Sequence, residues 1–218
     1  MSAQFELWGA ETPRTFRPLW VLEELGVDYA HNPIESRSGE TQTEDFKSLT
    51  QKQKIPLLRD NDFYLSESVA ISRYLIRTYG AGKFWNPETA QEQAREDEWC
   101  SHIYGELDET GLYVMRRHGD LAHIYGGSEE VMSSTQAYVE KQLQGIALHL
   151  EGRPTVMSGG FGLADIMLMS CVDWAVVYQL SVPEVLLVYR AGIAQRPAYQ
   201  KAMAKNYAKL LGGQNGAA

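Results

Sequence analysis

The chain has 218 residues, of which 44% are hydrophobic and 22% charged, and its formal net charge is −8. This composition is typical of a globular protein with a sizeable core, and the length suits one domain or two small ones. The acidic balance argues against a nucleic acid or an anionic membrane as partner, although a local site can still bind a small anion.

The two cysteines, Cys100 and Cys171, form no CxxC pair and join no Cys/His cluster of zinc spacing. The sequence therefore excludes a disulfide-stapled scaffold and predicts no metal site. The first residues have no basic region followed by an apolar run, so we expect no secretory signal. No apolar stretch reaches the roughly 18 residues of a spanning helix, and we expect a cytoplasmic protein.

The first 80 residues alternate short apolar runs with helical patterns. We place the first helix from about Thr15 to Leu25, ended by Gly26, because Pro18 would be costly inside a helix that began earlier. The remaining expected elements are strands at 5–8 and 27–34, a hairpin of 55–59 and 63–65, and a helix from 68 to 79. This order predicts an α/β domain at residues 1–80, with helices packed on a mixed sheet.

Residues 81–87, punctuated by glycine and proline, read as a linker, and helical patterns alone follow it. The expected helices lie at 92–117, 128–150 and 163–180, then near Pro183 and from Pro197. Ser128 is a favoured N-cap for the second of these, and Trp174 in the third is expected in the core. The sequence therefore predicts an all-helical domain at residues 88–218.

Three places in the first domain could carry chemistry. Pro56 opens a predicted strand, either as an edge-strand proline or as a cis-proline that exposes the backbone of Ile55 to an extended ligand. Ser68 either caps a helix or, with the helix end, binds a carboxylate, while Glu67 takes an ammonium group. Thr12 is either a plain cap or a hydroxyl that could stabilise a thiolate.

These motifs occur in one order, and here the chain resembles the cytosolic glutathione transferase family. The segments that carry the resemblance are the turn and helix at 12–29, the strand at 53–58, the Glu-Ser turn at 66–71, the buried helix start at 161–166, and Arg-Pro-Ala-Tyr at 196–199. The resemblance spans nearly the whole chain. It implies a thioredoxin-like N-terminal domain that binds glutathione, followed by a C-terminal helical-bundle domain.

The resemblance also implies roles for particular residues. Glu67 and Ser68 would hold the γ-glutamyl head of glutathione, and the backbone of Ile55 before Pro56 would pair with its cysteinyl part. Gln53 and Lys54 would lie near the glycyl end. By resemblance we also expect a homodimer, with contacts near Arg73, Tyr74 and Arg77, and a role in detoxification.

Thr12 falls at the position of the family's catalytic hydroxyl, and Thr15 is the next candidate. No cysteine precedes Cys100, so an exchange mechanism through an enzyme mixed disulfide is disfavoured. The predicted reaction is attack of the glutathione thiolate, as co-substrate, on a small hydrophobic electrophile. Tyr104, Leu107 and Tyr113 of the helical half either line the electrophile pocket or belong to the core.

The chain departs from the family pattern at three places. Thr12 stands where serine or tyrosine is usual, Gly162 stands where serine or threonine usually caps the buried helix, and Thr50-Gln51 replaces an Asn-Pro often seen before the cis-proline strand. Because of Thr12, a non-catalytic module that binds glutathione or a protein stays a second hypothesis. A specialised glutathione-dependent dehalogenase or ether-cleaving enzyme is a third.

Overall fold

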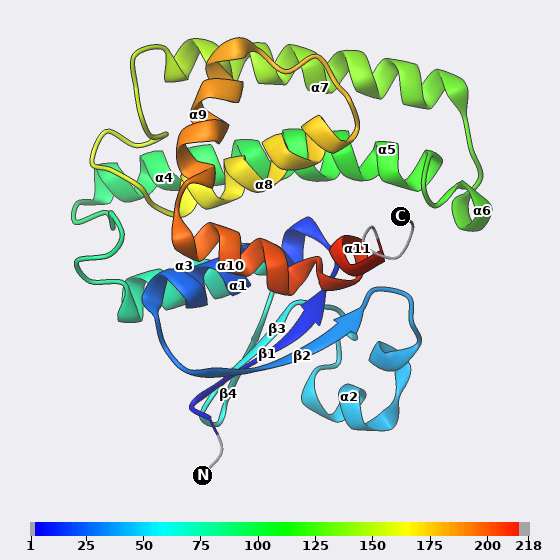
Figure 1. Cartoon of the computed structure of the whole chain (residues 1–218), viewed down its shortest axis with the longest axis vertical. Helices are drawn as coiled ribbons and strands as arrows, with labels where there is room; N and C mark the ends of the chain where they lie inside the picture. Colours follow the sequence, from blue (N-terminus) through cyan, green and yellow to red (C-terminus); the bar gives the residue numbers. More distant parts are fainter. Residues whose placement is uncertain (1–2, 214–218) are drawn as a thin grey trace. The chain divides into compact units, whose positions relative to one another are not determined.

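A computed structural model of the protein describes residues 3–213 (Figure 1). The described chain forms two compact units, one made of the residues up to Asn86 together with those from Ala194 on, the other of Pro87–Ile193. The break after Asn86 falls inside the segment predicted as a linker. The last helices, which we placed in the second domain, group instead with the first unit. Residues 214–218 of that predicted domain lie outside the described residues.

The first unit is a four-stranded sheet with helices packed on it. Its elements are β1 (Phe5–Ala10), α1 (Pro13–Leu25), β2 (Tyr29–Glu35), a 3-10 turn (Glu40–Gln42), α2 (Glu44–Leu49), β3 (Leu57–Asp60), β4 (Phe63–Ser66), α3 (Ser68–Tyr79), α10 (Pro197–Asn206) and α11 (Ala208–Gly213). The strand order is β2-β1-β3-β4, with β2 parallel to β1 and the other pairs antiparallel. The predicted thioredoxin-like arrangement is therefore confirmed.

Helices α1, α3 and α10 lie on one side of the sheet, and α2 lies away from them (Figure 1). Leu7 of β1, Leu58 of β3 and Leu75 of α3 have no exposed surface and form the core between these layers. The last helices join this unit because Tyr199 of α10 packs edge-on against Trp20 of α1, with ring centroids 5.1 Å apart. An aromatic pair of this kind stabilises by roughly 0.5–1.5 kcal/mol beyond the area it buries.

Helix α1 begins earlier than we expected, at Pro13, and keeps Pro18 inside. Thr12 sets the start because its side chain accepts a hydrogen bond from the Thr15 backbone N–H, while Thr15 returns a bond to the Thr12 N–H. Pro13 then occupies the first helical position, where no N–H is needed. Our placement of the start near Thr15 was wrong because this capping box outweighs the one hydrogen bond that Pro18 cannot donate.

The second unit is all helical. Its elements are α4 (Ala90–His102), a π-helical segment (Ile103–Leu112), α5 (Tyr113–His118), α6 (Ala122–Tyr125), α7 (Glu129–Leu150), α8 (Leu163–Val177) and most of α9 (Glu184–Ala194). Helix α4, the π-helical segment and α5 run on as one rod, along which α7 and α8 lie (Figure 1). Helix α8 is apolar on nearly every side and correspondingly buried.

The π-helical segment is the main difference from the single helix predicted at 92–117. It brings Gly111 so close to α7 that a Cβ there would lie 2.5 Å from Val139 Cγ2 and 3.0 Å from the Glu106 carbonyl. Ser128 caps α7 as predicted, accepting from the Val131 N–H at 3.2 Å. At the start of α8, Gly162 has no side-chain bond to give, and Asp165 accepts from the Gly162 N–H at 2.9 Å.

Candidate functional site

Three of the predicted site segments leave the sheet at one end. In the register of the strands, Trp8 of β1 lies beside Leu57 of β3, and Leu57 lies beside Ser66 of β4. Beyond this row, β1 continues into the turn that contains Thr12, the segment 53–56 leads into β3, and β4 runs into Glu67 and Ser68. Residues that are far apart in the sequence therefore lie together at one end of the strands.

Each of these three segments holds one non-glycine residue in the left-handed region. Glu11 has φ 59°, Gln53 has φ 51° and Glu67 has φ 77°. Such backbone costs roughly 1–3 kcal/mol per residue and clusters at functional sites. Among the described residues, these are three of the six non-glycine residues with positive φ; the other three, Arg37, Asn61 and Gln179, lie elsewhere.

Gly9 holds two of these segments together. Its φ is 125°, and a Cβ at this position would lie 2.5 Å from Thr15 Cγ2 and 3.0 Å from Ile55 Cβ. Only a residue without a side chain permits both the backbone angle and the close approach. The Thr15 side chain and the segment before β3 therefore both pack against Gly9.

We call residues 11–15 the Thr12 turn, and in it the two candidate hydroxyls differ in what they can do. Thr15 is fully buried, and its hydroxyl lies 2.7 Å from the side-chain oxygen of Asn206 and 2.9 Å from the Thr12 carbonyl. Thr12 is 7% exposed, and its hydroxyl accepts from the Thr15 N–H at 3.0 Å. The two hydroxyl oxygens are 3.0 Å apart. Of the two, Thr12 is the one that retains surface.

The Ile55–Pro56 peptide bond is cis, as the sharper of our two interpretations predicted. The alternative, a plain edge-strand proline, is wrong because Pro56 leads into β3, which is paired on both sides. Pro56 is buried and Ile55 half-buried, whereas Lys54 is exposed and Gln53 half-buried. All four residues lie in one short segment before β3, at the end of the sheet where the Thr12 turn and the Glu-Ser turn also lie.

Ser68 is the first residue of α3 and is not its N-cap, so the capping interpretation is wrong. Glu67 is the residue at the cap position, and its side chain makes no capping bond. The first backbone N–H groups of α3 therefore receive no hydrogen bond from the side chain of the cap residue. The Ser68 hydroxyl beside this end is buried, with the residue 4% exposed.

Two cations at the Glu-Ser turn escaped sequence reasoning. Arg17 of α1 is fully buried and donates from Nη1 to the Ser68 hydroxyl at 3.3 Å. Lys52 forms an ion pair with Glu67 at 3.4 Å, and both side chains are more than half exposed. An exposed pair of this kind contributes about 0–1 kcal/mol, so Glu67 can exchange Lys52 for another ammonium group. The sequence signal for the Arg17 contact would have been an arginine among the apolar residues of the first predicted helix.

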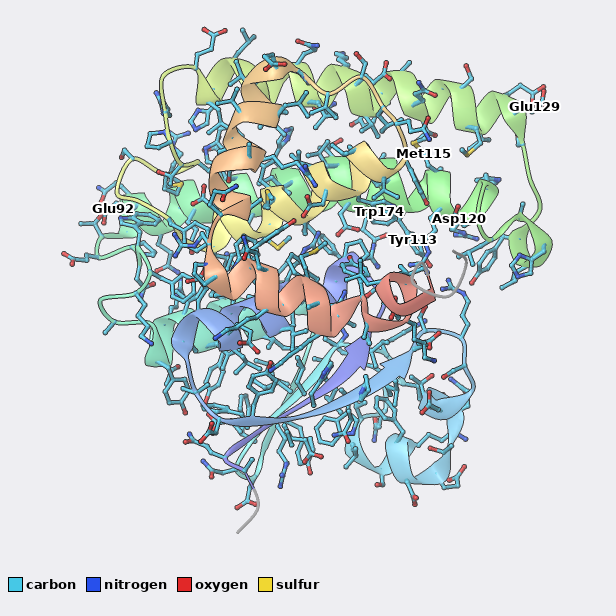
Figure 2. All side chains as sticks on the ribbon, in the orientation of Figure 1. Glu92, Tyr113, Met115, Asp120, Glu129 and Trp174 are labelled. Carbon is cyan, nitrogen blue, oxygen red and sulfur yellow. The ribbon has the colours of Figure 1, made fainter. Side chains whose placement is uncertain are left out.

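The three residues proposed for an electrophile pocket do not share one environment. Leu107 has no exposed surface and belongs to the core of the helical unit. Tyr104 is half-buried and donates to Glu109 at 3.0 Å. Tyr113 is also half-buried, and Figure 2 shows it on the side of α5 away from α7, whereas the buried Met115 points toward α7. Trp174 of α8 is 7% exposed, consistent with a place in the core.

Among residues 3–213, the structure contains no group of three or more His, Cys, Asp or Glu side chains arranged to hold a metal ion. Within the same part of the chain, no helix is both long and apolar enough to cross a membrane. Both cysteines are buried in the helical unit, in α4 and α8.

A four-stranded mixed sheet of this order, a cis-proline before β3 and an uncapped helix at a Glu-Ser turn define a thioredoxin-like domain of the glutathione transferase type. Comparison with known proteins agrees. Residues 3–77 match the family described as "Glutathione S-transferase, N-terminal domain". Glutathione S-transferase theta-1 of Bos taurus is 29% identical over 145 residues, which cover 65% of this chain and 60% of the bovine protein.

Solved structures share the fold over nearly the whole chain. A glutathione transferase of Phanerochaete chrysosporium in complex with oxidized glutathione superposes with a TM-score of 0.83 at 20% identity, covering 94% of this chain and 96% of that one. A theta class glutathione S-transferase of Xanthomonas axonopodis with glutathione bound gives a TM-score of 0.77 at 22% identity, covering 92% and 97%. Residues 3–77 therefore belong to the glutathione S-transferase N-terminal domain family, and the chain shares the fold of solved glutathione transferases.

Proposed function

We propose that the protein is a glutathione transferase that uses the Thr12 hydroxyl to hold the glutathione thiol as a thiolate. The observation that carries the proposal is the meeting of the Thr12 turn, the cis-Pro56 segment and the Glu67-Ser68 turn at one end of the sheet. The chain matches 60% of the length of its bovine relative, so the support for this activity comes from the chain's own residues.

The head group of glutathione carries one carboxylate and one ammonium, and the Glu-Ser turn offers a partner for each. The uncapped end of α3, the Ser68 hydroxyl and the Arg17 guanidinium behind it favour the carboxylate. Glu67, held only by an exposed ion pair with Lys52, favours the ammonium. In the same arrangement, the backbone of Ile55 would pair with the cysteinyl part of the tripeptide. Gln53 and Lys54 would meet the glycyl end.

The magnitude of the thiol activation is within reach of Thr12. A free thiol has a pKa of about 8.5, and lowering it by about two requires roughly 2.7 kcal/mol. A hydrogen bond to a charged group contributes about 1.5–3 kcal/mol, and a helix end up to about 1 more. The thiol proton leaves to water, and the thiolate sulfur then forms the new bond to the electrophile, displacing a leaving group with its electron pair or adding to an activated double bond.

The electrophile is proposed to be small and hydrophobic, and Tyr104 and Tyr113 of the helical unit, both partly exposed, are its proposed contacts. We further propose a cytoplasmic homodimer. Phe63 and Tyr64 on the outer strand β4 are 48% and 39% exposed, which is unusual for aromatic residues unless another surface covers them. Arg73, Tyr74 and Arg77 of the neighbouring α3 would border this contact, and sedimentation equilibrium would test it.

Conjugation of glutathione to a panel of aryl and alkyl electrophiles tests the proposed activity. Thr12→Val should lower kcat/KM at neutral pH about 10- to 150-fold, because the donor to the thiolate is lost. Thr12→Ser, which retains the hydroxyl, is the matched control and should stay within a few-fold of wild type. Wild-type protein that binds glutathione but turns over no electrophile would favour the non-catalytic module. A fully active Thr12→Val would remove Thr12 from the mechanism.

Glutathione binding tests the head-group assignment separately. Glu67→Ala should weaken binding because the ammonium loses its only carboxylate partner in the turn, and Lys52→Ala is the control because it frees Glu67 without removing it. Calorimetry at neutral pH measures both. A Glu67→Ala protein with wild-type affinity would contradict the assignment.

A further inference from the structure

The Thr12 turn is held by a residue from the far end of the chain. Asn206, the last residue of α10, is fully buried. Its side-chain nitrogen donates to the Thr12 carbonyl at 3.1 Å, and its side-chain oxygen lies 2.7 Å from the Thr15 hydroxyl. Its backbone carbonyl also accepts from the Glu11 N–H at 2.9 Å. Asn206 therefore contacts Glu11, Thr12 and Thr15 through three of its own polar groups, one for each partner.

The hydrogen-bond directions around Asn206 are determined by chemistry. The Thr12 carbonyl can only accept, so the amide nitrogen of Asn206 must face it and the amide oxygen must face Thr15. The Thr15 hydroxyl has one proton, which it donates to that oxygen across the short 2.7 Å contact. The Thr15 oxygen meanwhile accepts from the Thr12 N–H at 3.2 Å. Thr15 is thus fully engaged and has no proton to offer a ligand.

The Thr12 hydroxyl, in contrast to that of Thr15, can still donate its proton to a ligand. Its hydroxyl accepts from the Thr15 N–H at 3.0 Å, and its own proton is free to point to Thr15 or to a ligand. The Thr12 carbonyl accepts a hydrogen bond from Asn206, so both the side chain and the backbone of Thr12 are held in place. A donor fixed in this way loses little conformational freedom when a thiolate arrives, and such supporting contacts are what keep a reacting group aligned.

On the basis of the proposed function, we infer that Asn206 is a positioning residue for thiol activation: by accepting from Thr15 and donating to the Thr12 carbonyl, it makes the Thr12 hydroxyl the aligned donor to the glutathione thiolate. Asn206 touches neither the thiol nor the electrophile in this role. It acts through Thr12 and Thr15, and the C-terminal helix becomes part of the machinery of the N-terminal domain.

The test is the pKa of the thiol of bound glutathione, followed by thiolate absorbance near 240 nm as the pH is raised, alongside the pH profile of kcat/KM. Asn206→Leu keeps the size of the side chain and removes both polar atoms. It should raise the thiol pKa by about one, so that the thiolate fraction and kcat/KM fall about tenfold below that pKa. Well below that pKa, where glutathione binds as the thiol, the affinity for glutathione should stay near wild type. Asn206→Asp keeps the shape and the bond from Thr15, but it sets an acceptor against the Thr12 carbonyl, and it should shift the pKa in the same direction.

Lys205→Gln is the matched control on the same helix. It removes the contacts of Lys205 to Glu23 at 2.6 Å and to the Tyr29 hydroxyl at 2.9 Å, which hold α10 to α1 and β2, without touching Thr12 or Thr15. It should lower the unfolding midpoint and leave the thiol pKa unchanged. An Asn206→Leu protein that unfolds more easily but keeps the wild-type thiol pKa would reduce Asn206 to a structural residue and overturn the inference.

A double-mutant cycle tests whether Asn206 affects the thiol pKa through Thr15. Thr15→Ser should behave as wild type, whereas Thr15→Val should raise the thiol pKa, and Asn206→Leu added to Thr15→Val should raise it little further because the two residues act together. Fully additive effects would contradict action through Thr15. If wild-type protein binds glutathione and forms no thiolate at any pH near neutrality, the proposed function fails and the role of Asn206 with it. If the wild-type protein forms the thiolate and Asn206→Leu does not change its pKa, the inference about Asn206 fails while the proposed function stands.

Discussion

Asp60, at the turn of the β3–β4 hairpin, ties the sheet to the end of α3, and its removal should destabilise the first unit strongly. The carboxylate is 4% exposed and accepts from Tyr74 at 2.8 Å, from Gln4 at 3.1 Å and from Tyr79. Burial raises the pKa of this carboxyl, but the hydrogen bonds from Tyr79, Tyr74 and Gln4 together lower it more, so that it lies below its ordinary value of 3.8.

The substitution Asp60→Asn removes the charge and keeps the shape. A hydrogen bond to a charged group contributes about 1.5–3 kcal/mol, and a neutral one about 1, so weakening the two tyrosine bonds should cost about 2–3 kcal/mol at pH 7. Asp62→Asn makes the same charge change at an exposed residue of the same turn, and it should change the free energy of unfolding by less than about 0.5 kcal/mol.

Urea unfolding at pH 7, 5 and 3.5 measures the difference. Because the folded-state pKa of Asp60 is lowered, its stabilisation is complete above the unfolded-state value near 3.8 and is lost as the pH falls through the folded-state pKa. The difference between wild type and Asp60→Asn should therefore be full at pH 7 and 5 and should shrink as the pH drops below about 4. A cost below about 0.5 kcal/mol at pH 7, or one that grows in acid, would refute the reasoning.

Three further predictions concern other parts of the chain. Gly111→Ala should destabilise the helical unit by about 1–3 kcal/mol, because the added Cβ would lie 2.5 Å from Val139 Cγ2, and Val139→Ala should restore part of the loss in thermal unfolding. Tyr79, whose pKa is raised chiefly by its bond to Asp60, contributes stability that is complete below about pH 10 and lost above it, so the urea midpoint of Tyr79→Phe should fall less than that of wild type between pH 9 and 11. Arg17→Met should raise the Kd for glutathione about tenfold in calorimetry, with Lys52→Met as a control for charge, and unchanged affinity would contradict the role given to Arg17.

Much of the fold and part of the site could be predicted because their signals are local. The stop at Gly26 and the cap at Ser128 are each determined by a few neighbouring residues. Apolar spacing predicted most helices, although it could not reveal the π-helical segment, in which the hydrogen-bond pattern changes while apolar residues still recur along the chain. Each of the three motifs of the first domain has two interpretations when taken alone. The family resemblance, which rests on their order along the chain, favoured one interpretation for each.

Other features depend on contacts that no short segment contains. Arg17 meets Ser68 across 51 residues, and Asn206 meets Thr15 across 191. The sequence spacing between such residues carries no signal, because the contacts exist only after α1 has packed on α3 and on α10.

The sequence by itself determined which chemical groups lie at the proposed glutathione site: a hydroxyl before the first helix, a Glu-Ser turn and no early cysteine. The tertiary structure decided how those groups are used. It placed Ser68 inside the helix instead of at its cap, buried Thr15, and set Asn206 of α10 against the Thr12 turn. The physical reason is that residue types follow from the chain alone, whereas the burial and orientation of a hydroxyl follow from what packs against it.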